Sequence, residues 1–296
     1  MKEIKSTKVR RRTKQLEVIV TRVITETPDT STLVLFAGND DLSYEPGHFV
    51  TIDPHQFPEL QRWTGYLEDL KGKKEPPRAY SLFSAPHEKY LAITIKEETY
   101  ITGETPYPPL ISPTLAYRCP PGTPLIITGF TGPFTLSEKL REGTDAVIHA
   151  CAGSGVVPSM SIIKAGLRND EAMRHVLLYS NKTVEDTIYL ELLREMERDY
   201  PDRFEVHFFF TRIKQKPTFS PHIALGRINQ AAVEAVLNSE NNPVVFVCGP
   251  ANTPLEKKRA RQDPTIQLKP KFMESVLEMI HTAGVDPRRI KHEGWG

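Results

Sequence analysis

The hydrophobic pattern of this 296-residue chain changes near residue 140, and this change limits the folds that the chain can adopt. Before it, short apolar segments are separated by turn residues, with few helical stretches between them, which predicts a sandwich or an antiparallel β-barrel. After it, apolar strands alternate with helices, which predicts a parallel sheet with helices on its faces. We therefore expect two domains, a β-barrel followed by an α/β domain.

The individual segments follow from these two patterns. Strands of the first half are expected at residues 16–24, 32–36, 48–52, 79–83, 91–96 and 124–128. In the second half, strands expected at 146–152, 175–179, 204–210, 244–248 and 289–292 alternate with helices expected at 159–167, 187–199, 230–237 and 270–283. Residues 54–77 fit neither the apolar period of a helix nor that of a strand, and they are expected to form a long loop.

Composition excludes several classes of function. The net charge of +1 favours neither nucleic acid nor a membrane surface as a partner. No apolar run reaches the roughly 18 residues of a membrane helix, and residues 1–14 lack an apolar signal-peptide core, so we expect a cytoplasmic protein. The three cysteines, Cys119, Cys151 and Cys248, are too few for an all-cysteine iron-sulfur cluster, and no metal site is expected.

The amino terminus is the exception to this even balance of charge. Residues 2–14 contain Lys2, Lys5, Lys8, Arg10, Arg11, Arg12 and Lys14 against Glu3 alone. Such a run is expected to be a solvated, flexible tail over residues 1–14, although it would also attract an acidic partner.

A glycine-rich turn follows the first expected strand of the second half. Gly153, Ser154 and Gly155 precede an expected helix, and Pro158 stands where the usual dinucleotide fingerprint has its third glycine. Glycines let a ligand approach the backbone, and free N–H groups at a helix start favour an anion such as a pyrophosphate. The turn therefore predicts nucleotide binding. The alternative is that it is an ordinary connection between a strand and a helix.

Residues 78–81, Arg-Ala-Tyr-Ser, offer a cation, an aromatic ring and a hydroxyl from one expected strand. Arg78 and Tyr80 share one face of that strand. Because a guanidinium suits a diphosphate and a Tyr ring suits a flat heterocycle, the pair predicts a flavin dinucleotide. The alternative is a strand with a surface Arg and a packed Tyr.

Cys248, Gly249 and Pro250 end a later strand of the second half. Ligands of open α/β sheets gather at the carboxyl ends of strands, so Cys248 is expected to face the same crevice as Gly153. The alternative interpretation is that Cys248 is an ordinary small, buried apolar residue.

In their order and spacing, these three segments resemble the ferredoxin-NADP reductase family. Residues 46–50 and 129–136 extend the resemblance, and residues 110–115, Leu-Ile-Ser-Pro-Thr-Leu, are most similar to the bacterial ferredoxin/flavodoxin-NADP reductases. The resemblance implies a FAD-binding β-barrel over residues 15–140 and an NAD(P)-binding α/β domain over 141–296. It also implies hydride transfer from NADPH to FAD and passage of single electrons to ferredoxin or flavodoxin.

The resemblance assigns expected roles to individual residues. Arg78 would contact the FAD diphosphate, Tyr80 the isoalloxazine ring and Ser81 the region of flavin N5, with Ala79 between them. The backbone of Ile93, Thr94, Ile95 and Lys96 would lie beside the adenosine half, and Ser112 would meet the pyrophosphate. Gly153, Ser154, Gly155, Pro158, Gly249 and Pro250 would hold the nicotinamide nucleotide. Trp295 would cover the flavin face where nicotinamide must stack, and Ser81, Cys248 and Glu293 would line the reacting centre.

The choice of coenzyme depends on cations near the adenosine 2′-phosphate. Lys182, Arg212 and Arg227 stand where the resembling reductases place such cations, which implies NADPH, although Lys182 replaces a usual Arg and cannot form the same planar fork. Residues 181–186 also resemble NADH-using cytochrome b5 reductases. The alternatives are therefore an NADH-using reductase component of an oxygenase or cytochrome-type system, a flavin-binding electron-relay subunit without turnover, and a structural scaffold that would be colourless.

Overall fold

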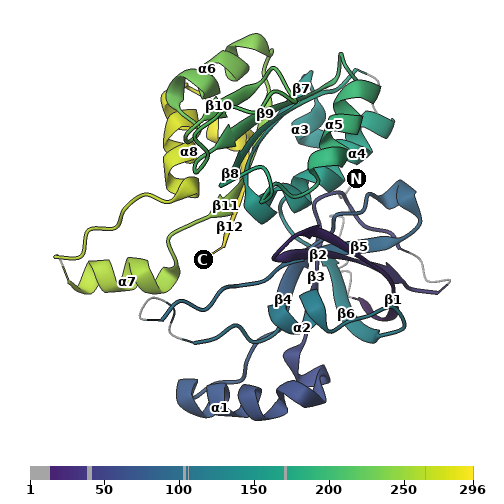
Figure 1. Cartoon of the computed structure of the whole chain (residues 1–296). Coiled ribbons are helices and arrows are strands. Elements are labelled where there is room, and N and C mark those ends of the chain that lie inside the picture. The colour runs from purple at the N-terminus through teal and green to yellow at the C-terminus, as the bar shows by residue number, and fades with distance from the viewer. Residues whose placement is uncertain are drawn as a thin grey trace, which may run out of the picture.

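The computed structural model describes residues 14–38, 42–102, 105, 107–169, 172–263 and 265–295. The basic tail expected over residues 1–14 lies outside this part of the chain, except for Lys14. The described chain contains two six-stranded sheets, one in each of two domains that lie against each other (Figure 1).

The first sheet is antiparallel and closes on itself. Its strands are β1 (Lys14–Thr27), β2 (Thr30–Phe36), β3 (Phe49–Ile52), β4 (Arg78–Ser81), β5 (Leu91–Lys96) and β6 (Pro124–Thr131), in the order β4-β3-β6-β1-β2-β5. Just after β4, Leu82 bridges Ile93 of β5, and the Phe83 N–H donates to the Ala92 carbonyl at 2.8 Å. The two edge strands therefore meet, and the predicted β-barrel is confirmed.

The barrel core follows from the period of two in its strands. In β1, Leu16, Val18 and Val20 are 2%, 1% and 0% exposed, whereas the intervening Glu17 and Ile19 face outward. Alternate side chains of a strand point to opposite faces, so one face of each strand fills the barrel.

Residues 54–77 do not form the loop that the sequence predicted. Two short 3-10 turns, η1 (Pro54–Gln56) and η2 (Pro58–Leu60), lead into the helix α1 (Gln61–Lys71), which ends at Gly72 in the left-handed region with φ 63°. Only Thr64 and Leu67 of α1 are buried. A helix with so small a buried face has too weak an apolar period to be recognised. It lies on the side of the barrel away from the α/β domain (Figure 1).

The second sheet is parallel throughout, as predicted. Its strands are β7 (Ala146–Ala152), β8 (Arg174–Asn181), β9 (Phe204–Phe210), β10 (Ile223–Leu225), β11 (Val244–Pro250) and β12 (Ile290–Trp295), in the order β10-β9-β8-β7-β11-β12. The expected helices are α4 (Val156–Asn169), α5 (Leu190–Asp199), α6 (Gln230–Ser239) and α8 (Phe272–Thr282). Helices thus cover both faces of this sheet (Figure 1).

Several short elements complete the described chain. They are α2 (Ser112–Tyr117), α3 (Glu138–Arg141), α7 (Pro254–Gln262), η3 (Pro86–Glu88), η4 (Gly153–Gly155) and η5 (Pro287–Arg289). The sequence patterns did not indicate β10, α3 or α7. No described helix combines the length and apolar character needed to cross a membrane.

Helix α4 and the loop before α5 join the α/β domain to the barrel. Lys164 of α4, whose side chain is only 10% exposed, forms an ion pair with Glu88 at 2.6 Å. The ring of Tyr189 stacks on Phe83 with ring centroids 4.4 Å apart. Buried polar and aromatic contacts of this kind fix the two domains relative to each other.

Candidate active site

A hollow of about 550 Å³ opens between the two domains. Strands β4 and β5 of the barrel line one side, and the turn after β7 with the ends of β11 and β12 lines the other. It brings together many of the sequence-predicted site residues: Ala79, Tyr80, Ser81, Thr94, Lys96, Ser154, Pro158, Lys182, Cys248, Glu293 and Trp295. Ligands are expected at domain interfaces and at the carboxyl ends of the strands of an α/β sheet, and this hollow lies at both.

Arg78 does not line this hollow. Its guanidinium donates to Glu75 Oε2 and to the Pro76 carbonyl, both at 2.6 Å. The Glu75 side chain is 2% exposed and also accepts from Lys71 at 2.5 Å. Burial alone would raise the pKa of Glu75, but the bonds from Lys71 and Arg78 hold it below its usual value. Glu75 is therefore a fixed anion that orients Arg78.

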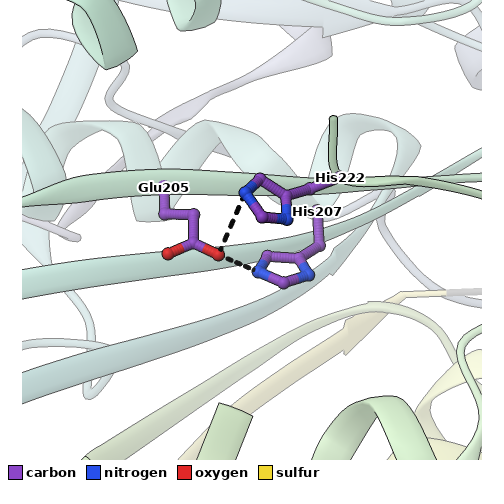
Figure 2. A group of neighbouring side chains, drawn as sticks. All are labelled: Glu205, His207 and His222. Atoms are coloured by element: carbon purple, nitrogen blue, oxygen red, sulfur yellow. Dashed lines mark hydrogen bonds and ion pairs between the residues drawn. The ribbon is translucent and has the colours of Figure 1, made fainter. Parts of the chain in front are cut away.

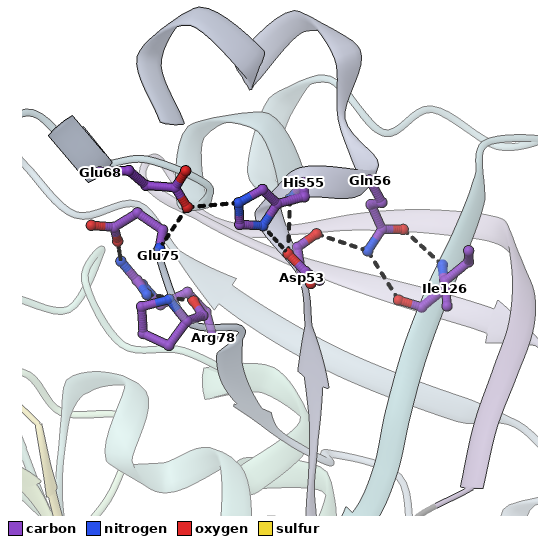
Figure 3. A network of polar contacts seen from close by, with 8 residues as sticks. Asp53, His55, Gln56, Glu68, Glu75, Arg78 and Ile126 are labelled. Carbon is purple, nitrogen blue, oxygen red and sulfur yellow. Dashed lines mark hydrogen bonds and ion pairs between the residues drawn. The ribbon is translucent and has the colours of Figure 1, made fainter. Parts of the chain in front are cut away.

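A network behind Arg78 ties it to the segment before α1 (Figure 3). The Glu75 N–H donates to Glu68 Oε1 at 2.8 Å, and the same oxygen faces His55 Nε2 at 2.8 Å. His55 Nδ1 in turn lies 2.5 Å from Asp53 Oδ1. The hydrogen bonds with Asp53 and Glu68 raise the pKa of His55. The segment that the sequence marked as a loop thus holds the Arg78 side chain.

Tyr80 and Ser81 are half-buried on the barrel side of the hollow. Tyr80 packs against the barrel core, and its burial raises the pKa of its hydroxyl. The ring is therefore held as a neutral aromatic surface, which suits contact with a flat heterocycle.

The predicted residues of β5 divide between the core and the hollow. Ile93 and Ile95 are 0% and 1% exposed and point into the barrel, so only their backbone can face a ligand. Thr94 and Lys96 line the hollow, and Lys96 Nζ binds Asp29 Oδ1 at 2.5 Å. This alternation follows from the period of two in a strand.

Ser112 is 5% exposed and does not line the hollow. Its hydroxyl accepts the Glu98 N–H at 3.2 Å. Glu98 itself lines the hollow, together with Glu97 and Thr99. In this structure Ser112 therefore helps to position residues 97–99, which line the hollow and which the sequence analysis did not predict as site residues.

The glycine-rich turn η4 presses against β11. Gly153 has φ 52°, a conformation that favours glycine. A Cβ on Gly155 would lie 2.1 Å from the Cys248 carbonyl oxygen and 2.7 Å from Cη2 of Trp295. A Cβ on Gly249 would lie 2.4 Å from the ring of Phe272. The backbone of this turn can therefore approach the strand only because residue 155 has no side chain.

Cys248, Glu293 and Trp295 lie together on the last two strands of the sheet. Cys248 of β11 pairs with Glu293 of β12, and Pro250 pairs with Trp295. The Cys248 thiol is 2% exposed, and burial raises its pKa well above the usual value, as do the nearby Cys151 and Glu293. All three cysteines are free and buried, as expected for a chain without disulfides.

Glu293 is the unusual member of this group. Its Oε2 is buried and has no hydrogen-bond partner within the described residues. Burial raises the pKa of its carboxyl group. Since an unsatisfied buried carboxyl group costs stability, its presence in a hollow indicates a role with a ligand or a proton.

The three predicted cations lie at the carboxyl ends of neighbouring strands. The Arg212 N–H donates to the Lys182 carbonyl at 2.9 Å, and the Gly226 N–H donates to the Phe210 carbonyl at 2.8 Å. Lys182, Arg212 and Arg227 are all exposed, and none has an ion-pair partner in the described part of the chain. Arg227 and Pro250 line a second hollow, of about 780 Å³, between these strand ends and α8.

Comparison with known proteins agrees with this geometry. Residues 150–255 match the family described as the oxidoreductase NAD-binding domain. The chain is 27% identical over 282 residues to the ferredoxin reductase component of a 3-ketosteroid-9-alpha-monooxygenase from Mycobacterium tuberculosis, covering 92% of this chain and 67% of that protein. A structure of ferredoxin-NADP⁺ reductase from Plasmodium falciparum with 2′P-AMP superposes with a TM-score of 0.65 at 18% identity, covering 95% and 96% of the two chains. This chain has the two-domain fold of the ferredoxin-NADP reductases.

The match over residues 150–255 identifies a nicotinamide-nucleotide domain of an oxidoreductase, and the relatives support the predicted flavoprotein. Another relative is the NADH-cytochrome b5 reductase 2-B of Vanderwaltozyma polyspora, 30% identical over 155 residues. The match spans 52% of this chain and only 50% of that relative. The expected similarity to the bacterial ferredoxin/flavodoxin branch stays a prediction, as do the domain boundaries and the roles of single residues.

Proposed function

We propose that this chain transfers electrons from NADPH to a small redox protein, with FAD as the carrier. The observation that carries the proposal is the hollow in which Tyr80 and Ser81 of the barrel are brought together with Cys248, Glu293 and Trp295 of the α/β domain. When bound, FAD accepts two electrons as a hydride and releases them one at a time, which is what such a transfer requires.

The residues present fit a flavin and a nicotinamide nucleotide. An Arg has five N–H donors, so the two bonds from Arg78 to Glu75 and Pro76 leave others for a diphosphate. At Gly153 an added Cβ would meet nothing within 4 Å, so the backbone of the turn is open there to a pyrophosphate. Trp295, 38% exposed, offers a ring for stacking in the hollow.

The side chains at the hollow would align the reactants and manage a proton. Ser81 would hydrogen-bond a ring nitrogen, and Cys248 would offer a small apolar surface on the opposite wall of the hollow. Glu293, with its raised pKa, is able to hold a proton nearer to neutral pH than an ordinary carboxyl group. Holding two flat rings in contact and excluding water are the main contributions that a protein makes to such a transfer.

Three exposed cations, which have no ion-pair partner among the described residues, favour NADPH over NADH. Lys182, Arg212 and Arg227 together suit a 2′-phosphate dianion, whereas a free ribose hydroxyl needs no such charge. The Plasmodium reductase, which resembles this chain in fold, has a structure with 2′P-AMP. We expect Arg212→Ser to raise the KM for NADPH about tenfold and to leave the KM for NADH unchanged, with Arg118→Ser as the matched surface control. Equal effects on both coenzymes would contradict the assignment.

Colour and reduction test the function directly. Purified protein should show flavin absorbance, and anaerobic stopped-flow mixing with NADPH should bleach it. Reduction of a panel of ferredoxins and flavodoxins, with NADPH and NADH in parallel, should then identify the acceptor. A colourless protein, or a flavin that no coenzyme bleaches, would refute the proposal and favour a scaffold or a relay subunit.

A second candidate is an NADH-using reductase component of an oxygenase or cytochrome system. It is favoured by residues 181–186 and by the relatives, one named as a monooxygenase component and the other as an NADH-cytochrome b5 reductase. The same panel separates the two candidates, because faster reduction with NADH and no transfer to flavodoxin would select the second. Docking of an acidic redox partner by the basic tail, and a cytoplasmic location, remain predictions.

A further inference from the structure

A carboxylate and two imidazoles meet at the edge of the α/β sheet (Figure 2). None of the three side chains lines the hollow between the domains. Glu205 and His207 are two residues apart on β9, so their side chains share one face of the sheet. His222 directly precedes the edge strand β10, and its carbonyl accepts the Phe208 N–H at 2.8 Å. This bond brings His222 beside His207.

The ligand atoms of the three side chains converge. One atom from each lies within 4.8 Å of the others. Both Nε2 atoms face the same oxygen, Glu205 Oε1: that of His207 is hydrogen-bonded to it, and that of His222 lies 3.6 Å away. Zinc binds such atoms at about 2.0–2.2 Å, which places ligands about 3.4 Å apart in a tetrahedron. Small rotations of the three side chains would therefore let them bind an ion in place of the proton that His207 and Glu205 share.

The surroundings orient the carboxylate for this role. Glu205 Oε2 accepts from Arg174, which also pairs with Glu240, whose side chain is only 8% exposed. One oxygen of Glu205 is thus held by Arg174 while the other is left for the imidazoles. A partner that fixes a ligand from behind is the usual arrangement around a bound metal.

A smaller hollow beside this cluster brings in one more carboxylate and two cations. Glu197 lines the adjacent hollow with Glu205 and His222, and its Oε1 accepts the Val206 N–H at 2.8 Å. The cations of that hollow are Arg194, which binds Glu191 at 3.1 Å, and Arg198.

We propose that Glu205, His207 and His222 bind a divalent transition-metal ion, best matched by Zn²⁺, which fastens the edge strand β10 to β9. Two imidazoles and one carboxylate are ligands that zinc prefers, with water in the fourth position. Strand β10 is only three residues long and pairs with β9 alone. A cross-link at its start would therefore stabilise its pairing with β9. Arg212 lies beyond the other end of β9, roughly 20 Å away at about 3.3 Å per residue, so the ion would lie far from the cations proposed to bind the coenzyme.

Metal analysis of the purified, tag-free full chain tests this site. After dialysis against Zn²⁺ and removal of free ion, we expect one equivalent of zinc per chain by mass spectrometry, and added zinc should raise the thermal midpoint by several degrees. His222→Asn should abolish both effects; its side chain is 43% exposed, so this variant is expected to fold. His207→Asn should do the same, and His281→Asn, on the exposed face of α8, is the matched control.

Two outcomes would overturn the inference. One is a wild-type chain that retains less than about a tenth of an equivalent of zinc. The other is an affinity for zinc, measured by titration calorimetry, that His222→Asn changes less than threefold. Because zinc content and calorimetry need neither flavin nor coenzyme, failure here is distinct from failure of the proposed electron transfer.

Discussion

Replacement of Gly155 by Ala tests the close approach of the nucleotide turn to β11. The added Cβ would lie 2.1 Å from the Cys248 carbonyl oxygen, about 1 Å inside normal contact. That oxygen belongs to the backbone of β11, which is paired on both sides by β7 and β12. The strand therefore cannot yield, and the turn and the Trp295 ring must move instead.

The cost of such overpacking is typically about 1–3 kcal/mol. If the shift falls on the coenzyme-binding geometry, this corresponds to an affinity about 5- to 150-fold weaker. The barrel is untouched, so FAD content should stay at the wild-type level. Titration with NADP⁺, followed by flavin difference spectroscopy, measures the affinity, and denaturant unfolding shows any part of the cost that falls on stability.

Gly65→Ala is the matched control for this experiment. Gly65 lies within α1, where an added Cβ meets nothing within 4 Å, so the change should be neutral or slightly stabilising. A Gly155→Ala chain with wild-type coenzyme affinity and wild-type unfolding free energy would refute the reasoning.

Three further predictions concern other parts of the site and the core. Trp295→Ala should tighten NADP⁺ binding about fivefold, because a stacked ring worth about 1 kcal/mol no longer competes with nicotinamide; unchanged affinity would argue against a covering role. Glu75→Gln should weaken FAD binding about tenfold, since Arg78 loses its orienting anion; equilibrium dialysis of FAD against a Glu59→Gln control measures this, and equal retention by the two variants would contradict it. Burial lowers the pKa of His175 to about 3, so this ring stays neutral in the folded chain while it protonates in the unfolded chain below about pH 6.5. Stability should therefore fall by about 2 kcal/mol from His175 between pH 7 and pH 5, and denaturant unfolding that gives equal stability at both pH values would disprove this.

The sequence predicted those elements whose side-chain period is strong. Strand β1 alternates buried and exposed residues, and β9 is almost wholly buried, so both patterns are readable without a structure. Helix α1 was missed because its stability comes from polar contacts and from two buried residues, not from an apolar stripe. The short strand β10 was missed because three residues carry no measurable period.

The candidate site was predictable where topology decides it. Parallel strands end at the same edge of a sheet, so Cys248, Lys182 and the glycine turn could be placed together from their positions alone. The partner of Arg78 could not, because Glu75 is held by tertiary contacts of α1 that no local pattern reveals. The pairing of His222 with Glu205 likewise depends on how a loop returns to the sheet.

The contacts between α4 and the barrel have a consequence for how a coenzyme would reach the barrel side of the hollow. Lys164 and Glu88 form a largely buried ion pair, and Ser161 Oγ donates to the Ser84 carbonyl at 2.6 Å. Breaking a buried pair of this kind costs several kcal/mol, so the two domains should move as a single rigid unit. Admission of nicotinamide would then require rotation of the Trp295 side chain and not a hinge between domains. The rate of that event would be set by one aromatic ring and the few atoms around it.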